Sequence, residues 1–437
     1  MLEPPNDDRL EDINDASVDE FPDLVLLEQT RDQPQVEDVY GAGKDAADTA
    51  LQDVTLGPDA EVAITAGSRG IHDMPEVLLG MVDHLKERGY TPIIVPSMGS
   101  HGGATAEGQV EMLESLGITE EAMGCEIRSS LAVEEVGQDA EGRPIYAARD
   151  ALKADAVLLA NRVKLHTDFR GSVESGLCKM TVIGLGKQRG ADITHQAGLA
   201  KGLDQAIPER AAVLFEETPI VGGVAIYENA NERAAHVEGI PVEDILEREP
   251  ELLDASEELF PRLPVENLDL LIVDEIGKNI SGTGMDTNVV GRMLYHGQSG
   301  SESPVYTRIY VRGLTEASHH NAIGMGLADF IHADAVSQIG LTDTYINAIT
   351  GGEPARARLP VVTPTDEVAL LLTYSATGCS SPGDMRIGFV ENTLDLGRFL
   401  VSENVAEELE DREDIELLDN ISIRTYDGDF AFDLFEE

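Results

Sequence analysis

Three histidines and one lysine occur in loops that follow segments typical of buried strands. They are His101, His166, Lys179 and His195. Imidazole ordinarily titrates near neutral pH, so two of these histidines would suit general acid–base chemistry. The third could bind a metal as a neutral imidazole. Because one histidine does not hold a metal alone, the other ligands would come from a cofactor or from Cys178.

The lysine of this set has an unusual sequence environment. Lys179 lies between Cys178 and the apolar run 180–183 (MTVI), which predicts that it is partly buried. Burying an ammonium group costs free energy unless the group is paired or used covalently. Lys179 is therefore a candidate covalent anchor or Schiff-base lysine. The run GLGK at 184–187 resembles a phosphate cradle but lacks the Walker A spacing.

The charge of the chain is strongly acidic, with one local exception. The 437 residues include 82 Asp and Glu and 31 Lys and Arg, a net charge of −51. This balance argues against nucleic-acid partners and anionic membrane surfaces, and it predicts a halophilic protein whose carboxylates keep its surface hydrated at high salt. Segment 161–201 instead carries seven basic and three acidic residues, a charge of +4. Such an island predicts a site for phosphate, carboxylate or both.

Four further residues are candidates for binding anions. Arg69 lies between glycines in the loop TAGSRGIH and could bind a carboxylate or phosphate through both guanidinium nitrogens. Lys164 and Lys187 belong to the basic island. Lys278 lies in a glycine-rich loop that follows a predicted strand of the second half of the chain.

The elements that must position these residues alternate between strand and helix patterns. We expect strands at 61–66, 91–96, 154–160 and 220–227, with helices at 74–88, 106–116 and 241–259. A second alternation follows, with strands at 268–274 and 359–362 and helices at 315–330 and 365–374. The pattern predicts an α/β fold of two α/β domains with mostly parallel sheets and a ligand cleft between them.

The expected domain boundary lies near residue 264, where two prolines interrupt the chain. We therefore expect an N-terminal cofactor-binding and catalytic domain at 1–264, with about 1–20 as a flexible acidic tail. A C-terminal α/β domain at 265–437 would close the cleft. The N-terminus lacks the pattern of a signal peptide, no run approaches 18 apolar residues, and the three cysteines are scattered. These features predict a cytoplasmic protein.

The histidine and lysine loops resemble those of the nickel-pincer-nucleotide-dependent lactate racemase family and its wider group of 2-hydroxyacid racemases and epimerases. Loop 98–109 (MGSHGGATAEGQ) resembles the family's first histidine loop, and 164–184 (KLHTDFRGSVESGLCKMTVIG) resembles its second histidine and lysine region. The spacings from Lys179 to Gly184 and to His195 also look the same. The resemblance covers roughly residues 60–200.

The resemblance implies an isomerase with a particular cofactor, pyridinium-3,5-bisthiocarboxylic acid mononucleotide carrying nickel. Lys179 would bind this nickel pincer nucleotide covalently, and His195 would be the protein's nickel ligand. His101 and His166 would take and return the hydroxyl proton of a lactate-like or larger 2-hydroxyacid. The resemblance also implies that cofactor-synthesis enzymes mature the protein.

The remaining candidates take supporting roles in this scheme. Gly184, Lys187 and Lys164 would contact the cofactor, and Arg69 and Lys278 would bind the anionic substrate. The sequence departs from the family at Ala66, where the family has an aspartate, and in the run ESGLCK. These departures concern the substrate more than the cofactor.

Two other functions fit the same residues. One is a non-catalytic binder or sensor of a phosphorylated anion, and the other is a conventional metal-dependent lyase or hydrolase. Oligomer formation is left open by the sequence.

Overall fold

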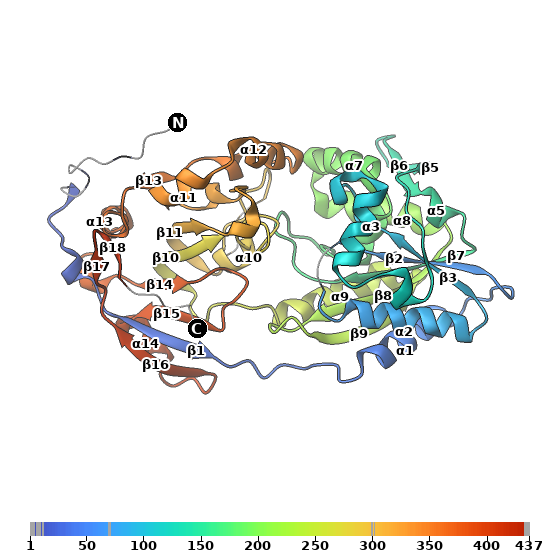
Figure 1. Cartoon of the computed structure of the whole chain (residues 1–437), viewed down its shortest axis with the longest axis horizontal. Coiled ribbons are helices and arrows are strands. Elements are labelled where there is room, and N and C mark those ends of the chain that lie inside the picture. Colours follow the sequence, from blue (N-terminus) through green and yellow to red (C-terminus); the bar gives the residue numbers. More distant parts are fainter. Residues whose placement is uncertain are drawn as a thin grey trace. The chain divides into compact units, whose positions relative to one another are not determined.

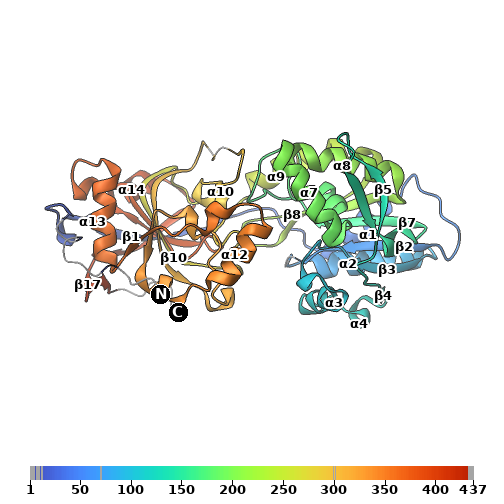
Figure 2. The ribbon, with the colours of Figure 1, turned by 90° about the horizontal axis from the view of Figure 1, so that it is seen from above.

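A computed structural model describes residues 5, 10, 13–68, 71–298, 300 and 302–431. The chain divides into two compact units (Figures 1 and 2). The first unit is Asp32–Phe260. The second unit combines Pro261 onward with the N-terminal residues up to Arg31.

The N-terminal residues differ from the expectation that 1–264 form one domain. Strand β1 (Leu24–Gln29) pairs antiparallel with β15 (Arg398–Ser402) and β16 (Ile415–Ile421) in the sheet of the second unit. The physical reason is its apolar run LVLLEQ, in which Leu24 and Leu27 are fully buried. The expected flexible tail is also partly packed, because Val18 and Phe21 join the same core.

The first unit is built on a six-stranded sheet with the order β4-β3-β2-β7-β8-β9. All neighbouring strands are parallel except β8 and β9. The strands are β2 (Glu61–Ala66), β3 (Thr91–Pro96), β4 (Glu126–Ile127), β7 (Ala156–Arg162), β8 (Ile220–Glu228) and β9 (Ala234–Pro241). A small hairpin of β5 (Val133–Gln138) and β6 (Pro144–Ala148) lies outside this sheet.

Helices cover both faces of this sheet. Helices α1 (Val39–Ala50) and α2 (Met74–Glu87) share one core with α3 (Ala106–Ser115) and α4 (Glu120–Met123), while α8 (Leu203–Glu217) and α9 (Ile245–Glu258) share the other (Figure 2). In α2 the buried residues recur at helical spacing, for example Leu78, Met81, Val82 and Leu85, which explains its amphipathic packing. Short α5 (Arg149–Leu152) precedes β7.

The second unit contains an eight-stranded sheet with the order β13-β12-β11-β10-β14-β15-β1-β16. The first five strands of that order are parallel and the last three are antiparallel additions. These parallel strands are β10 (Asn267–Ile276), β11 (Val305–Leu314), β12 (Phe330–His332), β13 (Val361–Thr363) and β14 (Ile387–Val390). The described helices are α10 (Thr287–Val290), α11 (Ala333–Gln338), α12 (Leu341–Thr350), α13 (Asp366–Thr377) and α14 (Glu403–Leu409). The expected α/β class with mostly parallel sheets is therefore confirmed.

The expected helix at 315–330 is wrong. That segment forms two short 3₁₀ turns, Glu316–Ser318 and Met325–Leu327. His319, His320 and Gly324 have positive φ angles, which an α-helix cannot contain. Across the described residues, none of the helices is both long enough and apolar enough to cross a membrane.

Candidate functional site

The candidate site lies at the carboxyl ends of three adjacent strands of the first unit. Strands β3, β2 and β7 are neighbours and parallel, so the loops that follow them leave the same edge of the sheet. Ligands of open α/β sheets bind at this edge. The three loops contain Ser68, His101 and His166, respectively after β2, β3 and β7.

His101 lies in a tightly folded loop between β3 and α3. Its Nδ1 is 2.5 Å from the Ser68 hydroxyl oxygen, so the loop after β2 fixes the orientation of the exposed imidazole. Thr105 accepts a hydrogen bond from Gly108 N at 3.0 Å and caps α3. Gly102 must be a glycine, because a Cβ there would lie 2.6 Å from the backbone of Gly108 and Gln109.

His166 and Lys179 are in direct contact. Lys179 Nζ lies 2.5 Å from His166 Nε2, and Asp168 N donates to His166 Nδ1 at 3.0 Å. The His166 backbone N–H donates to Glu174 Oε2 at 2.5 Å, and the imidazole lies against Phe169 with ring centroids 4.6 Å apart. Both ring nitrogens and the backbone of His166 are thus positioned by neighbours within its own loop and by Lys179.

Lys179 is the last residue of the short helical turn α6 (Leu177–Lys179), which continues into a π-turn, η4 (Met180–Gly184). Single π-turns occur frequently at functional sites. The amino end of α6 is held from two sides, since Cys178 N donates to Glu249 Oε2 at 2.9 Å and Asn161 donates to Gly176 O at 2.8 Å. A Cβ on Gly176 would lie 2.3 Å from Glu249 Oε1, so this glycine makes room for the carboxylate.

His195 lies on α7 (Lys187–Lys201), where the charge of Lys179 acts on its pKa. Burial lowers the pKa of His195, and the positive charge of Lys179 lowers it further, whereas Asp168 and Asp192 oppose the shift. The lowered pKa favours the neutral imidazole, which is the form that binds a metal.

Two buried carboxylates belong to this site but were missed by sequence reasoning. Burial raises the pKa of Glu174 and that of Glu249 to about 7 each, although backbone N–H donors partly oppose both shifts. Glu174 holds the His166 loop, and Glu249 holds the Lys179 turn. Glu174 could have been noticed as an acid within the basic island, but Glu249 lies in an ordinary amphipathic helix with no distinguishing pattern.

The proposed cofactor contacts occupy three different environments. Lys164 pairs through its backbone with Ser175, in a bridge that closes the His166 loop. Gly184 packs so closely on the His101 loop that a Cβ would lie 2.7 Å from Ser97 O. Lys187 is fully buried at the start of α7.

The two predicted substrate residues are not joined to this group by the structure. Arg69 lies outside the described residues. Lys278 belongs to the second unit, in the loop after β10, where its Nζ donates to Gly282 O at 3.0 Å. The structure thus brings His166 and Lys179 into contact, with His195 within electrostatic range of Lys179. His101 lies on the loop after β3, which is separated from β7 by β2. The roles of Arg69 and Lys278 remain predictions.

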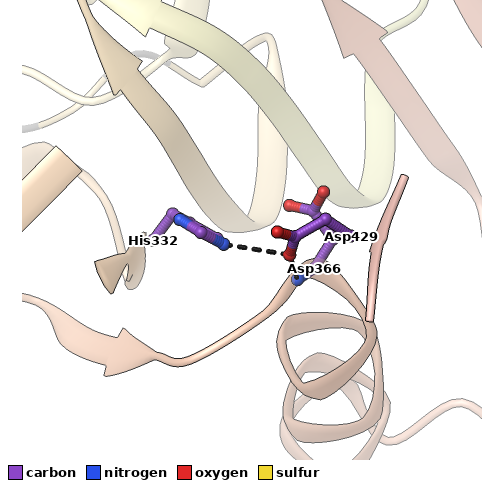
Figure 3. Close-up of side chains that lie close together, drawn as sticks. All are labelled: His332, Asp366 and Asp429. Carbon is purple, nitrogen blue, oxygen red and sulfur yellow. Dashed lines mark hydrogen bonds and ion pairs between the residues drawn. The ribbon is translucent and has the colours of Figure 1, made fainter. Parts of the chain in front are cut away.

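A second cluster of titratable groups was not anticipated from the sequence. Figure 3 shows His332, Asp366 and Asp429, whose potential ligand atoms lie within 4.8 Å of one another. His332 Nε2 lies 3.1 Å from Asp429 Oδ1, but Asp366 already accepts hydrogen bonds from the Tyr310 hydroxyl at 2.7 Å and from Arg312 Nε at 3.0 Å. A carboxylate paired with a guanidinium is a poor metal ligand. We interpret this cluster as an ion-pair network that holds the hairpin of β17 (Thr425–Tyr426) and β18 (Asp429–Phe430) against the start of α13.

Comparison with solved structures supports the class of fold. The fold of the chain is similar to that of the lactate racemase apoprotein from Thermoanaerobacterium thermosaccharolyticum, with a TM-score of 0.51. The sequences are 13% identical, and the match covers 87% of this chain and 95% of that one. At this identity the likeness concerns the fold alone. No family model and no curated protein matches the chain.

Proposed function

We propose that this protein is a racemase or epimerase of a 2-hydroxyacid that works with a lysine-tethered nickel pincer nucleotide. The observation that carries the proposal is the contact of Lys179 Nζ with His166 Nε2 at the carboxyl edge of the sheet. The charge of Lys179 also acts on the pKa of His195. The similarity of the fold to a lactate racemase apoprotein supports it.

The side chains of the site fit this cofactor. Lys179 would form the covalent link, because it lies on a turn that is fixed at its amino end and projects its amine toward His166. His195 would bind nickel, because its lowered pKa keeps the imidazole neutral. When bound, the cofactor would supply a hydride acceptor and donor for the substrate α-carbon.

The protein's own contribution is to move a proton and to hold the anion. His166 Nε2 is the ring nitrogen that faces the position of Lys179, so it is the atom that would exchange a proton with the substrate hydroxyl. His101, which comes from the loop after β3, would serve the opposite face. Arg69 and Lys278 are our proposed contacts for the substrate carboxylate, and Lys164 and Gly184 for the cofactor.

Racemisation of a deuterated substrate tests this proposal. Protein made together with the cofactor-synthesis enzymes would be incubated with single enantiomers of 2-hydroxyacids of increasing size, each deuterated at the α-carbon. We expect the opposite enantiomer to form with its deuterium retained, since hydride transfer does not exchange with water. Loss of the label to water would indicate proton abstraction instead, and activity with a divalent metal alone would favour a conventional lyase or hydrolase.

Binding without turnover would support the alternative of a non-catalytic sensor. The matched control for the racemisation assay is Lys179→Arg, which keeps the positive charge but cannot form the same covalent link. Under our proposal this variant should not racemise the substrate.

A further inference from the structure

Lys187 has a buried environment that is unusual for a lysine. Its side chain is fully enclosed, and Nζ donates to Pro96 O at 2.5 Å and to Gln109 Oε1 at 3.0 Å. Both acceptors are neutral. Burial lowers the pKa of Lys187 to about 8, while Asp150 partly opposes the shift. Such an ammonium is committed to contacts within the protein.

Gln109 carries the contact onward to the loop that contains His101. Gln109 is also fully buried, and its Nε2 donates to Gly99 O at 3.0 Å and to His101 O at 3.4 Å. The orientation of the amide follows from its partners, because the lysine requires an acceptor and the two carbonyls require a donor. Lys187 and Gln109 therefore form a continuous chain of hydrogen bonds from α7 to the backbone of His101.

The backbone at Lys187 supports a specific role for its side chain. Lys187 has a φ of 53°, in the left-handed region that favours glycine. A glycine would adopt this conformation without strain but could not reach Pro96 or Gln109. Residues in such conformations persist where the surrounding structure requires them, and here the requirement is the direction of the lysine side chain into the interior.

The position of Lys187 in the chain connects it to the other site residues. It follows the turn that carries Lys179 and begins α7, the helix that carries His195. The same segment touches the His101 loop through its backbone, where Gly99 N donates to Gly184 O at 3.4 Å. The side chain of Lys187 thus connects the segment that carries Lys179 and His195 to the loop that carries His101.

We propose that Lys187, acting through Gln109, is a positioning residue that sets the His101 loop relative to the segment carrying Lys179 and His195. Its catalytic consequence rests on the proposed function, whereas its effect on the loop does not. The inference replaces a direct cofactor contact of Lys187 with an internal one, because the ammonium is enclosed by Pro96 and Gln109.

Two variants separate the parts of this chain of contacts. Lys187→Met keeps most of the side-chain length but removes the donor. Gln109→Glu keeps an acceptor for Lys187, and even strengthens it, but removes the donor to the carbonyls of Gly99 and His101. The matched control is Lys153→Met, which alters an exposed lysine outside the site.

Hydrogen exchange of the cofactor-free protein, followed by mass spectrometry, measures the loop directly. We expect Lys187→Met and Gln109→Glu each to speed exchange in the peptide covering 97–105 by at least about tenfold, with little change in peptides of β8. Lys153→Met should behave as the parent protein. Unchanged exchange in the loop of both variants would overturn the proposal, even if the protein proves to have another activity.

Kinetics of the loaded enzyme test the catalytic consequence. Both variants should lower kcat by about 10- to 100-fold, with a smaller change in KM and with the Lys179 adduct and nickel content near those of the parent. The double variant should lose little more than either single variant, because the two residues act as a unit. Loss of the adduct or of nickel with a normal kcat in the loaded fraction would instead identify Lys187 as a cofactor contact and contradict the positioning role.

Discussion

At the scale of single residues, the proposed function would give the histidines of the site two different tasks. His195 is half-buried, and its partial burial and the positive charge of Lys179 lower its pKa, which suits a neutral metal ligand. His166 and His101 are instead fixed by hydrogen bonds from their own and neighbouring loops, which suits repeated proton transfer in one orientation.

This division predicts different losses in three variants. His195→Ala should lose most of the bound nickel while Lys179 keeps its adduct, because a neutral ligand has been removed. His101→Ala and His166→Ala should keep nickel and lose turnover by about 10²- to 10⁴-fold, the usual contribution of general acid–base catalysis. Metal analysis and peptide mass spectrometry on the same samples would check this. Retention of nickel in His195→Ala would contradict the assignment of the ligand.

The buried carboxylate of Glu249 predicts a pH dependence of stability. Burial raises its pKa from 4.5 to about 7, so between these values the folded protein holds a proton that the unfolded chain releases. The free energy of unfolding should therefore fall as the pH rises from about 4.5 to about 7, and Glu249 alone would account for a few kcal/mol of this change. Glu174 acts in the same direction.

Urea denaturation followed by circular dichroism at several pH values would measure this dependence. Glu249→Gln should flatten it, because the amide cannot ionise, whereas Glu247→Gln on the exposed face of the same helix should not. An equal slope in Glu249→Gln and the parent protein would show that the carboxylate does not control stability in this range.

At the scale of elements, the sequence predicted the buried parallel strands better than the antiparallel strands at the sides of the sheets. The expected strands at 61–66 and 91–96 are confirmed as β2 and β3, because continuous apolar runs are typical of buried parallel strands. Strand β9 was missed since its residues AAHVEGIP are only partly buried, and β1 was missed since its partners lie far away in the sequence. Hydrophobic spacing carries no information about such partners.

In the candidate site, too, the sequence predicted residue types but not the contacts between residues that lie far apart in the chain. The histidines and Lys179 could be selected from residue type and from glycine-rich loops that follow strands. The roles of Glu249, Asn161 and Gln109 depend on contacts across 71, 15 and 10 residues of sequence, respectively, which only the fold establishes. The π-turn after Lys179 likewise has no hydrophobic period that distinguishes it from an α-helix.

The turn that carries Lys179 should be sensitive to a single methyl group. In Gly176→Ala the new Cβ would lie 2.3 Å from Glu249 Oε1, so the carboxylate or the turn must move. We expect a loss of about 1–3 kcal/mol in stability, as for overpacked cores, together with less cofactor attached to Lys179. Gly57→Ala is the matched control, because a Cβ there would meet nothing within 4 Å. Unchanged stability and loading in Gly176→Ala would contradict a rigid turn.

At the scale of the whole molecule, the structure refines the contrast between the acidic chain and its basic island. At least two of the seven basic residues of the island are paired with acids outside it: Arg162 with Glu228, and Lys201 with Glu141 and Glu209. The net charge of +4 therefore overstates the positive charge that remains for a ligand. The sequence could not show this, because the partners lie 66, 60 and 8 residues away.

The global charge predicts that salt stabilises the protein. With a net charge of −51, mutual repulsion opposes the compact state, and salt at about 1 M shortens the Debye length to roughly 3 Å. We expect the Tm to rise by at least about 10 °C between roughly 0.1 M and 2 M KCl, because this repulsion is screened. Sucrose of equal osmolality is the control for general exclusion effects. A Tm that falls with KCl would show that the ion pairs outweigh the repulsion.

The covalent state of Lys179 tests the central claim most directly. The protein would be produced with the cofactor-synthesis enzymes, and the peptide containing Lys179 would be analysed by mass spectrometry. The proposed function predicts that this lysine carries the nucleotide, that nickel copurifies with it, and that Lys179→Arg carries neither. A fully active racemase whose Lys179 is unmodified would contradict the proposed mechanism.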